Sequence, residues 1–305
     1  MLTRLRHITT DHKNSAWPQY RVAPMGAHAI AYCDNRLDGP PLVLLHGLFD
    51  TKATWRRLAP LLPQYRLIAP DLLGHGDSAK PDCAAEPPAR RYAPDMQVDA
   101  LRDFIAALDL DELVLVGSSL GGGLALRLLL RFPELQLRGL VLIAAAGYPQ
   151  VLPGYLGLLG GWPGRLLATA PLGALARHAG LLRLISHRTF RRCFHDPDKI
   201  PPALVAATHA ALAAPGALYA YHQSAKNIVP PDNADFHRRF ADIACPTLVL
   251  WGARDRVLDP RNAHRFAADI PGAELHLLPD CGHAPHLEYP TTVARHIARF
   301  VSQLP

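Results

Sequence analysis

The fold is decided at residues 113–123, which read Leu113-Val114-Leu115-Val116-Gly117-Ser118-Ser119-Leu120-Gly121-Gly122-Gly123. An apolar, β-branched run ends abruptly in Gly-Ser-Ser-Leu-Gly, and an apolar pattern of helical period follows, so we predict a buried strand, a tight turn and a helix. Gly117 and Gly121 suit a turn in which strand and helix pass too close for side chains. Ser119 is then held in a strained conformation at a helix N-terminus, where free N–H groups favour negative charge. On its own, the pentapeptide also fits an ordinary strand–helix turn with a serine near the N-cap.

Composition predicts a soluble globular protein with a sizeable core, since 49% of the 305 residues are hydrophobic and 19% are charged. The net charge is +6, but the basic residues are scattered and no basic run is interleaved with aromatic residues, so no nucleic-acid partner is expected. Five cysteines without a C-x-x-C pair indicate reduced thiols in a cytoplasmic protein and no zinc site. Residues 1–20 lack the apolar core of a signal peptide, and no apolar run is long enough for stable membrane insertion.

Strand and helix patterns alternate along most of the chain. After a loose arm at residues 1–17, a hairpin is predicted at 20–33, with further strands at 42–45, 66–69, 113–118, 139–144, 246–251 and 274–278. Helices are predicted at 53–62, 96–108, 124–132, 261–269 and 290–301. This alternation predicts an α/β fold with a mostly parallel sheet that helices cover on both faces.

The alternation pauses between residues 147 and 240, which are helical in pattern and rich in Leu and Ala. We predict three segments: a first part of the core (1–146), a helical cap or lid (147–240) and a second part of the core (241–305). The cap leucines could line an acyl pocket, although most are expected to form a small core of the cap itself. They are Leu152, Leu156, Leu158, Leu159, Leu166, Leu167, Leu172, Leu175, Leu181, Leu182 and Leu184.

Two further polar residues follow predicted strands, as Ser119 does. The strand at 246–251 runs into a turn that ends on Asp255, and the strand at 274–278 runs into a loop that ends on His283. In parallel sheets, ligands bind at the carboxyl ends of the strands, so the three residues are expected on one edge. A serine hydroxyl needs a base to become a nucleophile, and the base needs an orienting acid.

With these motifs, the chain resembles the α/β-hydrolase superfamily, in its lipase, esterase and C–C-bond hydrolase branch, over residues 20–303. The matching motifs are His46-Gly47, Asp71-Leu72-Leu73-Gly74-His75-Gly76-Asp77-Ser78, Gly117-Ser118-Ser119-Leu120-Gly121 and the Asp255…His283 pair. The resemblance implies an eight-stranded sheet. It also implies Ser119 as nucleophile, His283 as base and Asp255 as orienting acid, with no metal or organic cofactor.

The resemblance further implies an oxyanion hole made by the backbone N–H groups of Leu120 and Leu48, with Phe49 as the alternative to Leu48. His46 and His75 are expected to bond to the backbone around the site. Rivals to the assigned base and acid remain nearby in the sequence: His276, His286, Asp259 and Asp280.

The serine in the turn also bears on the reaction. Haloalkane dehalogenases and epoxide hydrolases need a carboxylate there, so we expect a small ester with an apolar acyl or aromatic part as substrate. C–C-bond hydrolysis of meta-cleavage products is the alternative, because the segment 190–197 could offer Arg191 or Arg192 to a substrate carboxylate. Those enzymes usually carry Asn where this chain has Ser118, and often Trp where it has Ala284. Acyl transfer, a non-catalytic binding role and a homodimer also stay open.

Overall fold

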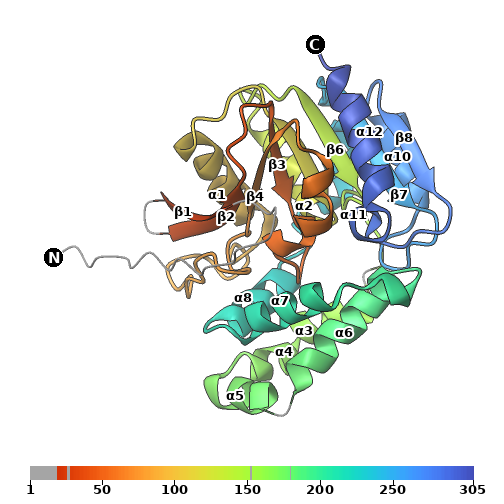
Figure 1. Ribbon diagram of the computed structural model, residues 1–305. Coiled ribbons are helices and arrows are strands. Elements are labelled where there is room, and N and C mark those ends of the chain that lie inside the picture. Colours follow the sequence, from red (N-terminus) through yellow and green to blue (C-terminus); the bar gives the residue numbers. More distant parts are fainter. Residues whose placement is uncertain (1–18, 26–27, 152, 179) are drawn as a thin grey trace.

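The computed structural model describes residues 19–25, 28–151, 153–178 and 180–305. The arm predicted at residues 1–17 lies outside them. The core is an eight-stranded sheet in the order β1-β2-β4-β3-β5-β6-β7-β8 (Figure 1). Strand β2 is antiparallel to both of its neighbours, β1 and β4, and β3 to β8 are parallel to one another. The strands are β1 (Gln19–Met25), β2 (His28–Asp34), β3 (Pro41–Leu45), β4 (Arg66–Pro70), β5 (Val114–Ser118), β6 (Gly139–Ile143), β7 (Thr247–Gly252) and β8 (Glu274–Leu278). The predicted α/β class and the eight strands are confirmed.

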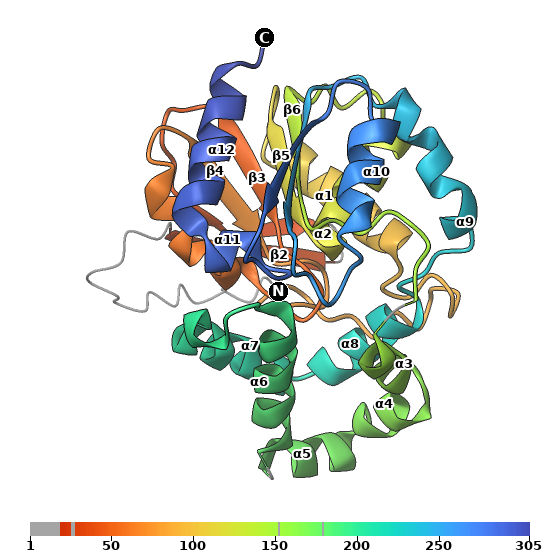
Figure 2. The ribbon, with the colours of Figure 1, turned by 90° about the vertical axis from the view of Figure 1, so that its right-hand side faces the viewer.

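Alternate residues of the central strands face two separate apolar layers, because successive side chains of a strand point to opposite faces. Val43 and Leu115 pack with α1 (Pro94–Ala107), α2 (Leu120–Arg131) and α10 (Arg261–Asp269). Leu44 and Val116 pack with η1 (Lys52–Arg57) and with α12 (Pro290–Ser302), which α11 (Pro285–Glu288) precedes. Figure 2 shows α12 and α10 on opposite sides of the sheet. Both faces of the central strands are therefore buried, as their continuous apolar runs predict.

A helical insertion (residues 147–240) leaves the sheet after β6 and returns before β7. Residues 154–226 of it lie beyond one end of the sheet in both views (Figures 1 and 2). Residues 233–240 instead lie beside the sheet, where Phe236 and Phe240 pack in the same apolar layer as α2 and α10. Its elements are α3 (Gly154–Gly160), α4 (Trp162–Leu167), α5 (Ala170–His178), α6 (Leu181–Cys193), η3 (Pro197–Lys199), α7 (Pro202–Ala213), α8 (Ala217–Lys226), α9 (Asn233–Phe236) and η4 (His237–Asp242). The last of them extends two residues past the predicted boundary.

Three predicted helices differ in detail from the structure. The helix expected at 124–132 is α2, which begins four residues earlier, at Leu120. The helix expected at 53–62 is two short 3-10 helices, η1 and η2 (Ala59–Leu61). Pro60 lacks the N–H that a continuous α-helix would need there, so the helical turns are interrupted. The helix expected at 96–108 begins at Pro94, because proline suits the first turn of a helix, where no N–H is needed.

Among the described residues, no single helix has the length and apolar character of a membrane span. Helices α7 and α8, which form an angle of 95°, are together long and apolar enough for a membrane span, by length and composition alone.

Candidate active site

Ser119 occupies a strained turn between β5 and α2. Its backbone angles are φ 53° and ψ −117°, a region that non-glycine residues rarely adopt. A Cβ on Gly117 would lie 2.5 Å from the carbonyl oxygen of Gly121, and one on Gly121 would lie 2.3 Å from that of Leu45. Side chains are therefore excluded on both sides of the serine, which is the physical reason for the Gly-x-Ser-x-Gly spacing.

Ser119, His283 and Asp255 form one hydrogen-bonded chain. The Nε2 atom of His283 lies 2.9 Å from the Oγ atom of Ser119, and its Nδ1 atom lies 2.8 Å from Oδ2 of Asp255. The other carboxylate oxygen of Asp255 accepts backbone N–H bonds from Val257 (2.8 Å) and Leu258 (3.0 Å). The acid is thus fixed from two directions, and it in turn fixes the imidazole plane. All three predicted residues are brought together at the ends of strands.

The insertion also contacts this chain of residues. The backbone N–H of His283 donates to the carbonyl oxygen of Cys193, the last residue of α6, at 2.6 Å. The imidazole-bearing loop is therefore tied to the insertion as well as to β8.

The rival residues have other partners. His286 lies 2.9 Å from the Thr54 hydroxyl, His276 pairs with Glu274, and Asp259 pairs with Arg261. The carbonyl oxygen of Asp280 accepts the hydroxyl of Tyr289. None of these contacts leads to Ser119, so the geometry separates the predicted residues from their rivals.

The two residues predicted to form the oxyanion hole, Leu120 and Leu48, lie on segments next to the serine. Leu120 is the first residue of α2, and the first N–H groups of a helix have no partner within it. The loop after His46 passes close to Ser119, since a Cβ on Gly47 would lie 3.2 Å from the Cβ of Ser119. Leu48 and Leu120 line the same cavity as Ser119. Phe49, the alternative to Leu48, has φ 61°, its ring stacks on Tyr221 at 5.0 Å, and it is not among the lining residues of this cavity.

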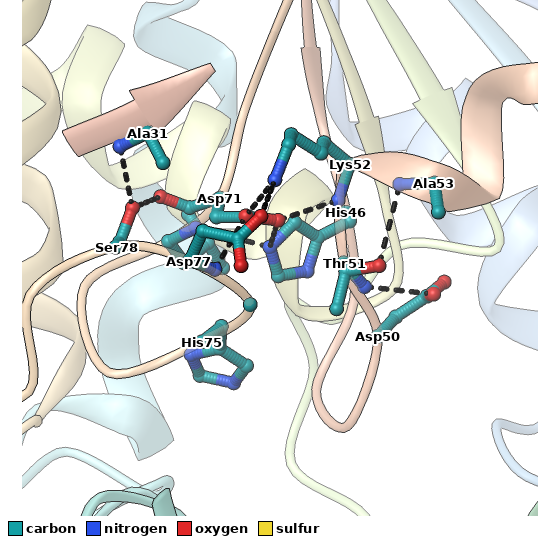
Figure 3. Close-up of polar contacts among 12 residues, drawn as sticks. Ala31, His46, Asp50, Thr51, Lys52, Ala53, Asp71, His75, Asp77 and Ser78 are labelled. Carbon is teal, nitrogen blue, oxygen red and sulfur yellow. Dashed lines mark hydrogen bonds and ion pairs between the residues drawn. The ribbon is translucent and has the colours of Figure 1, made fainter. Parts of the chain in front are cut away.

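A buried ionic network supports the loop that carries Leu48 (Figure 3). The Lys52 ammonium lies 2.5 Å from Oδ2 of Asp71 and 2.6 Å from Oδ2 of Asp77. Asp71 is fully buried, and it also accepts the backbone N–H groups of Lys52 (2.7 Å) and Asp77 (2.8 Å). Burial is the largest single influence and acts to raise the pKa of Asp71, but the Lys52 charge and the hydrogen bonds to the carboxylate together hold the pKa below its usual value. Burial acts to lower the pKa of Lys52, but the two carboxylates raise it.

The network explains the motif at residues 71–78. A Cβ on Gly76 would lie 2.1 Å from Oδ2 of Asp71, so only glycine leaves room for the carboxylate. The role of Lys52 was not predicted from the sequence. The sequence does show a lysine six residues after His46 and two aspartates in the motif at 71–78, which would need a cation if buried.

His46 and His75 bond to the backbone, as predicted. His46 Nε2 accepts the N–H of Leu72 at 3.0 Å, and His75 Nδ1 lies 3.1 Å from the carbonyl oxygen of Leu73. Burial lowers the pKa of His46 and lowers that of His75 to about 3, so both imidazoles are neutral at neutral pH.

A cavity of about 370 Å³ opens from Ser119 between the sheet edge and the insertion. Its lining includes Leu48, Tyr155, Leu156, Val257 and Leu258. In the part of the chain that the structure describes, no Asp, Glu, Lys or Arg lines it. The cavity therefore suits an uncharged, largely apolar ligand. No group of three His, Cys, Asp or Glu side chains among the described residues could hold a metal ion.

The predictions for the leucines of the insertion are confirmed for some and wrong for others. Leu156 lines the cavity, and Leu156, Leu159, Leu167 and Leu182 pack in one apolar cluster, which Phe49 of the core joins. Leu152 lies outside the described residues. The remaining six neither line the cavity nor form a core, because they face solvent; they are Leu158, Leu166, Leu172, Leu175, Leu181 and Leu184.

The sheet order and the strained serine turn define a class of enzyme fold, and comparison with known proteins names it. The family model described as "alpha/beta hydrolase fold" matches residues 40–290. The chain therefore belongs to the alpha/beta hydrolase family, as the sequence motifs indicated.

Relatives within this family differ in their reactions. Lipase 3 of Moraxella sp. (strain TA144) is 28% identical over 261 residues, which cover 85% of this chain and 76% of the lipase. The 2-hydroxymuconate semialdehyde hydrolase of Pseudomonas sp. (strain CF600) is 29% identical over 276 residues, with 87% and 88% covered. The crystal structure of a serine hydrolase involved in carbazole degradation superposes with a TM-score of 0.75 at 24% identity, covering 94% of this chain and 99% of that one. These similarities establish the family and the fold. Because the relatives catalyse different reactions, the reaction of this protein has to be inferred from its site.

Proposed function

We propose that this protein hydrolyses carboxylic esters by way of a covalent acyl-enzyme. One observation carries the proposal: the hydrogen-bonded chain Asp255–His283–Ser119 ends in an uncharged, mostly apolar cavity. A serine hydroxyl within 2.9 Å of an oriented imidazole has the geometry of an activated nucleophile.

The proposed mechanism assigns a role to each group. His283 takes the proton of the Ser119 hydroxyl as the oxygen attacks the ester carbonyl carbon, and Asp255 stabilises the imidazolium that forms. The backbone N–H groups of Leu120 and Leu48 hold the oxyanion, and the loss of one such donor typically costs about 3 kcal/mol. His283 then protonates the departing alcohol. Water, deprotonated by His283, releases the acid from Ser119.

The insertion serves as a cap in this proposal, with residues 1–146 and 241–305 as the core. The lining of the cavity favours an ester with an apolar acyl or aromatic part. A meta-cleavage product carries a carboxylate, which a Lys or Arg side chain would have to bind, and the described part of the lining contains neither. Arg191 and Arg192 are exposed and do not line the cavity. The similarity to 2-hydroxymuconate semialdehyde hydrolase keeps C–C-bond hydrolysis as the alternative, and acyl transfer would use the same residues.

The test is turnover of p-nitrophenyl esters, beside a dienol meta-cleavage substrate, by the wild type and by Ser119→Ala. We expect the variant to remain folded and to lose at least about 10⁴-fold in kcat/KM. Ser118→Ala, which removes the neighbouring hydroxyl, is the matched control and should retain activity. For the wild type, kcat/KM should rise about fourfold per added CH₂ from acetate to butyrate, at ~0.8 kcal/mol for each buried methylene.

Two results would contradict the proposal. One is substantial ester turnover by Ser119→Ala. The other is a wild type that cleaves the dienol faster than every ester. A chain-length series that is flat or falls would show that the cavity does not take the acyl group.

A further inference from the structure

Exposed large apolar side chains are concentrated on the helical insertion. Of the thirteen found among the described residues, seven lie on α3 to α6: Leu158, Trp162, Leu166, Leu172, Leu175, Leu181 and Leu184. Trp162 is 75% exposed and Leu175 is 62% exposed, whereas Trp55 and Trp251 in the core are fully buried. Single exposed leucines are ordinary, but a cluster on neighbouring short helices indicates an interaction surface.

The same helices carry positive charge with no acidic residue among them. From residue 135 to residue 195 the sequence contains seven arginines and no Asp or Glu. Arg165 on α4 and Arg183, Arg188, Arg191 and Arg192 on α6 are exposed. The core differs in this respect. It contains 22 of the 26 acidic residues of the chain, so its basic residues are accompanied by negative charge. The helices that carry the exposed apolar side chains therefore contribute positive charge and no negative charge.

The surface lies at the far end of the insertion. Figures 1 and 2 both show α5 farthest from the sheet, with α4 and the start of α6 beside it. A groove of about 910 Å³ between α6 and α7 begins at this end. Arg183, His187, Arg191 and His209 line it, with Asp198 as the acid in the lining. The groove extends the basic character of the end from α6 towards α7.

We propose that α4, α5 and the first turns of α6 form a docking surface for an anionic lipid bilayer. Apolar side chains enter the boundary between headgroups and acyl chains, while the arginines meet the negative headgroups. Trp162 suits this boundary because its ring is apolar and its N–H can still bond to a headgroup or to water. The absence of acidic residues in this stretch of sequence favours an anionic membrane over a protein partner of mixed charge. The proposal does not depend on the reaction at Ser119.

The experiment measures binding of the full chain to vesicles at low ionic strength. Vesicles of phosphatidylglycerol and phosphatidylcholine in equal parts are compared with pure phosphatidylcholine by co-sedimentation. We expect binding to the anionic vesicles that added salt weakens. Trp162 should report the contact directly: brominated lipid should quench the wild type more than Trp162→Phe.

Matched double variants separate this surface from general charge and hydrophobicity. Removal of two basic residues by Arg165→Gln/Arg183→Gln should weaken partitioning about 25-fold, at roughly fivefold for each residue near the surface. Arg56→Gln/Arg295→Gln makes the same charge change on exposed core arginines and should have little effect. Leu172→Ser/Leu175→Ser should reduce binding, while Leu61→Ser/Leu277→Ser, which changes two exposed leucines of the core, should not.

The proposal is overturned by several results. One is that the protein fails to bind anionic vesicles or binds both kinds equally. Another is that the core pairs weaken binding as much as the insertion pairs. If light scattering shows a dimer that Leu172→Ser/Leu175→Ser dissociates, and no vesicle binding occurs, the surface is a contact between copies instead. Circular dichroism and Tm establish that each variant is folded.

Discussion

Lys52→Met tests whether the buried ionic network stabilises the loop that carries Leu48. The substitution keeps the aliphatic stem and removes the ammonium that lies 2.5 Å from Asp71 and 2.6 Å from Asp77. Asp77 is well exposed and can turn to water, but the Asp71 side chain is fully buried and stays where it is. The substitution therefore leaves a buried carboxylate without its cation.

The magnitude follows from what remains around Asp71. Removal of one partner of a buried ion pair typically costs 3–5 kcal/mol. Two backbone N–H groups still donate to Asp71, from residues 52 and 77, so we expect the lower end, about 3 kcal/mol. At roughly 2.1 cal/mol/K per residue, unfolding of 305 residues has an entropy of about 640 cal/mol/K, and the Tm should fall by about 5 °C.

The loss should depend on pH in a defined direction. The pKa of Asp71 is lowered in the folded wild type, so the carboxylate contributes stability above its unfolded pKa of ~3.9. That contribution is lost as the pH falls through the folded pKa. In Lys52→Met, burial without the cation raises the pKa of Asp71 above its usual value, so the variant takes up a proton at a higher pH than the wild type. The difference in Tm between wild type and Lys52→Met should therefore be largest at neutral pH and shrink as the pH falls towards the folded pKa of the wild type.

The assay is thermal unfolding followed by circular dichroism across this pH range. Lys226→Met, which removes an exposed lysine at the end of α8, is the control and should change stability by no more than about 0.5 kcal/mol. In the double variant Lys52→Met/Asp71→Asn, most of the loss should be recovered, because the unpaired charge is gone. A loss of Tm that is the same in the double variant, or that persists unchanged at low pH, would refute the reasoning.

Two further predictions concern a partly buried acid and the serine turn. Burial raises the pKa of Asp50 to about 7, so the wild type should lose stability as the pH rises from about 4 to about 7, and Asp50→Asn should remove that slope. Parallel curves of Tm against pH for the two proteins would contradict this. Gly121→Ala places a Cβ 2.3 Å from a carbonyl oxygen and should cost at least about 3 kcal/mol or prevent folding. Gly157→Ala is its control: it is an exposed site on α3 where the described structure has nothing within 4 Å of the added Cβ, and it should gain about 0.5–1 kcal/mol in chemical denaturation. Equal effects at the two glycines would show that the close approach does not matter.

The sequence by itself determined the parts of this protein that depend on local pattern. The short apolar runs that begin at residues 113 and 247 predicted buried strands, which β5 and β7 are, and helix α10 lies at the predicted residues because its period is unbroken. Ser119, Asp255 and His283 could be predicted because parallel strands bring their carboxyl ends to one edge, so position after a strand implies proximity. Pro60 also indicates an interruption of the helix predicted at 53–62, although that prediction did not take it into account.

Only the tertiary structure decided which distant groups meet. The pairing of Lys52 with Asp71 and Asp77 joins residues 19 and 25 positions away, and no periodicity encodes it. The same holds for the leucines of the insertion: their spacing is the same whether they face a core, a cavity or solvent, and packing placed Leu182 inside and Leu175 outside. The motifs around Ser119, Asp255 and His283 could each be found in a short stretch of sequence, while the size and charge of the cavity and the exposed apolar end of the insertion depend on how the helices pack.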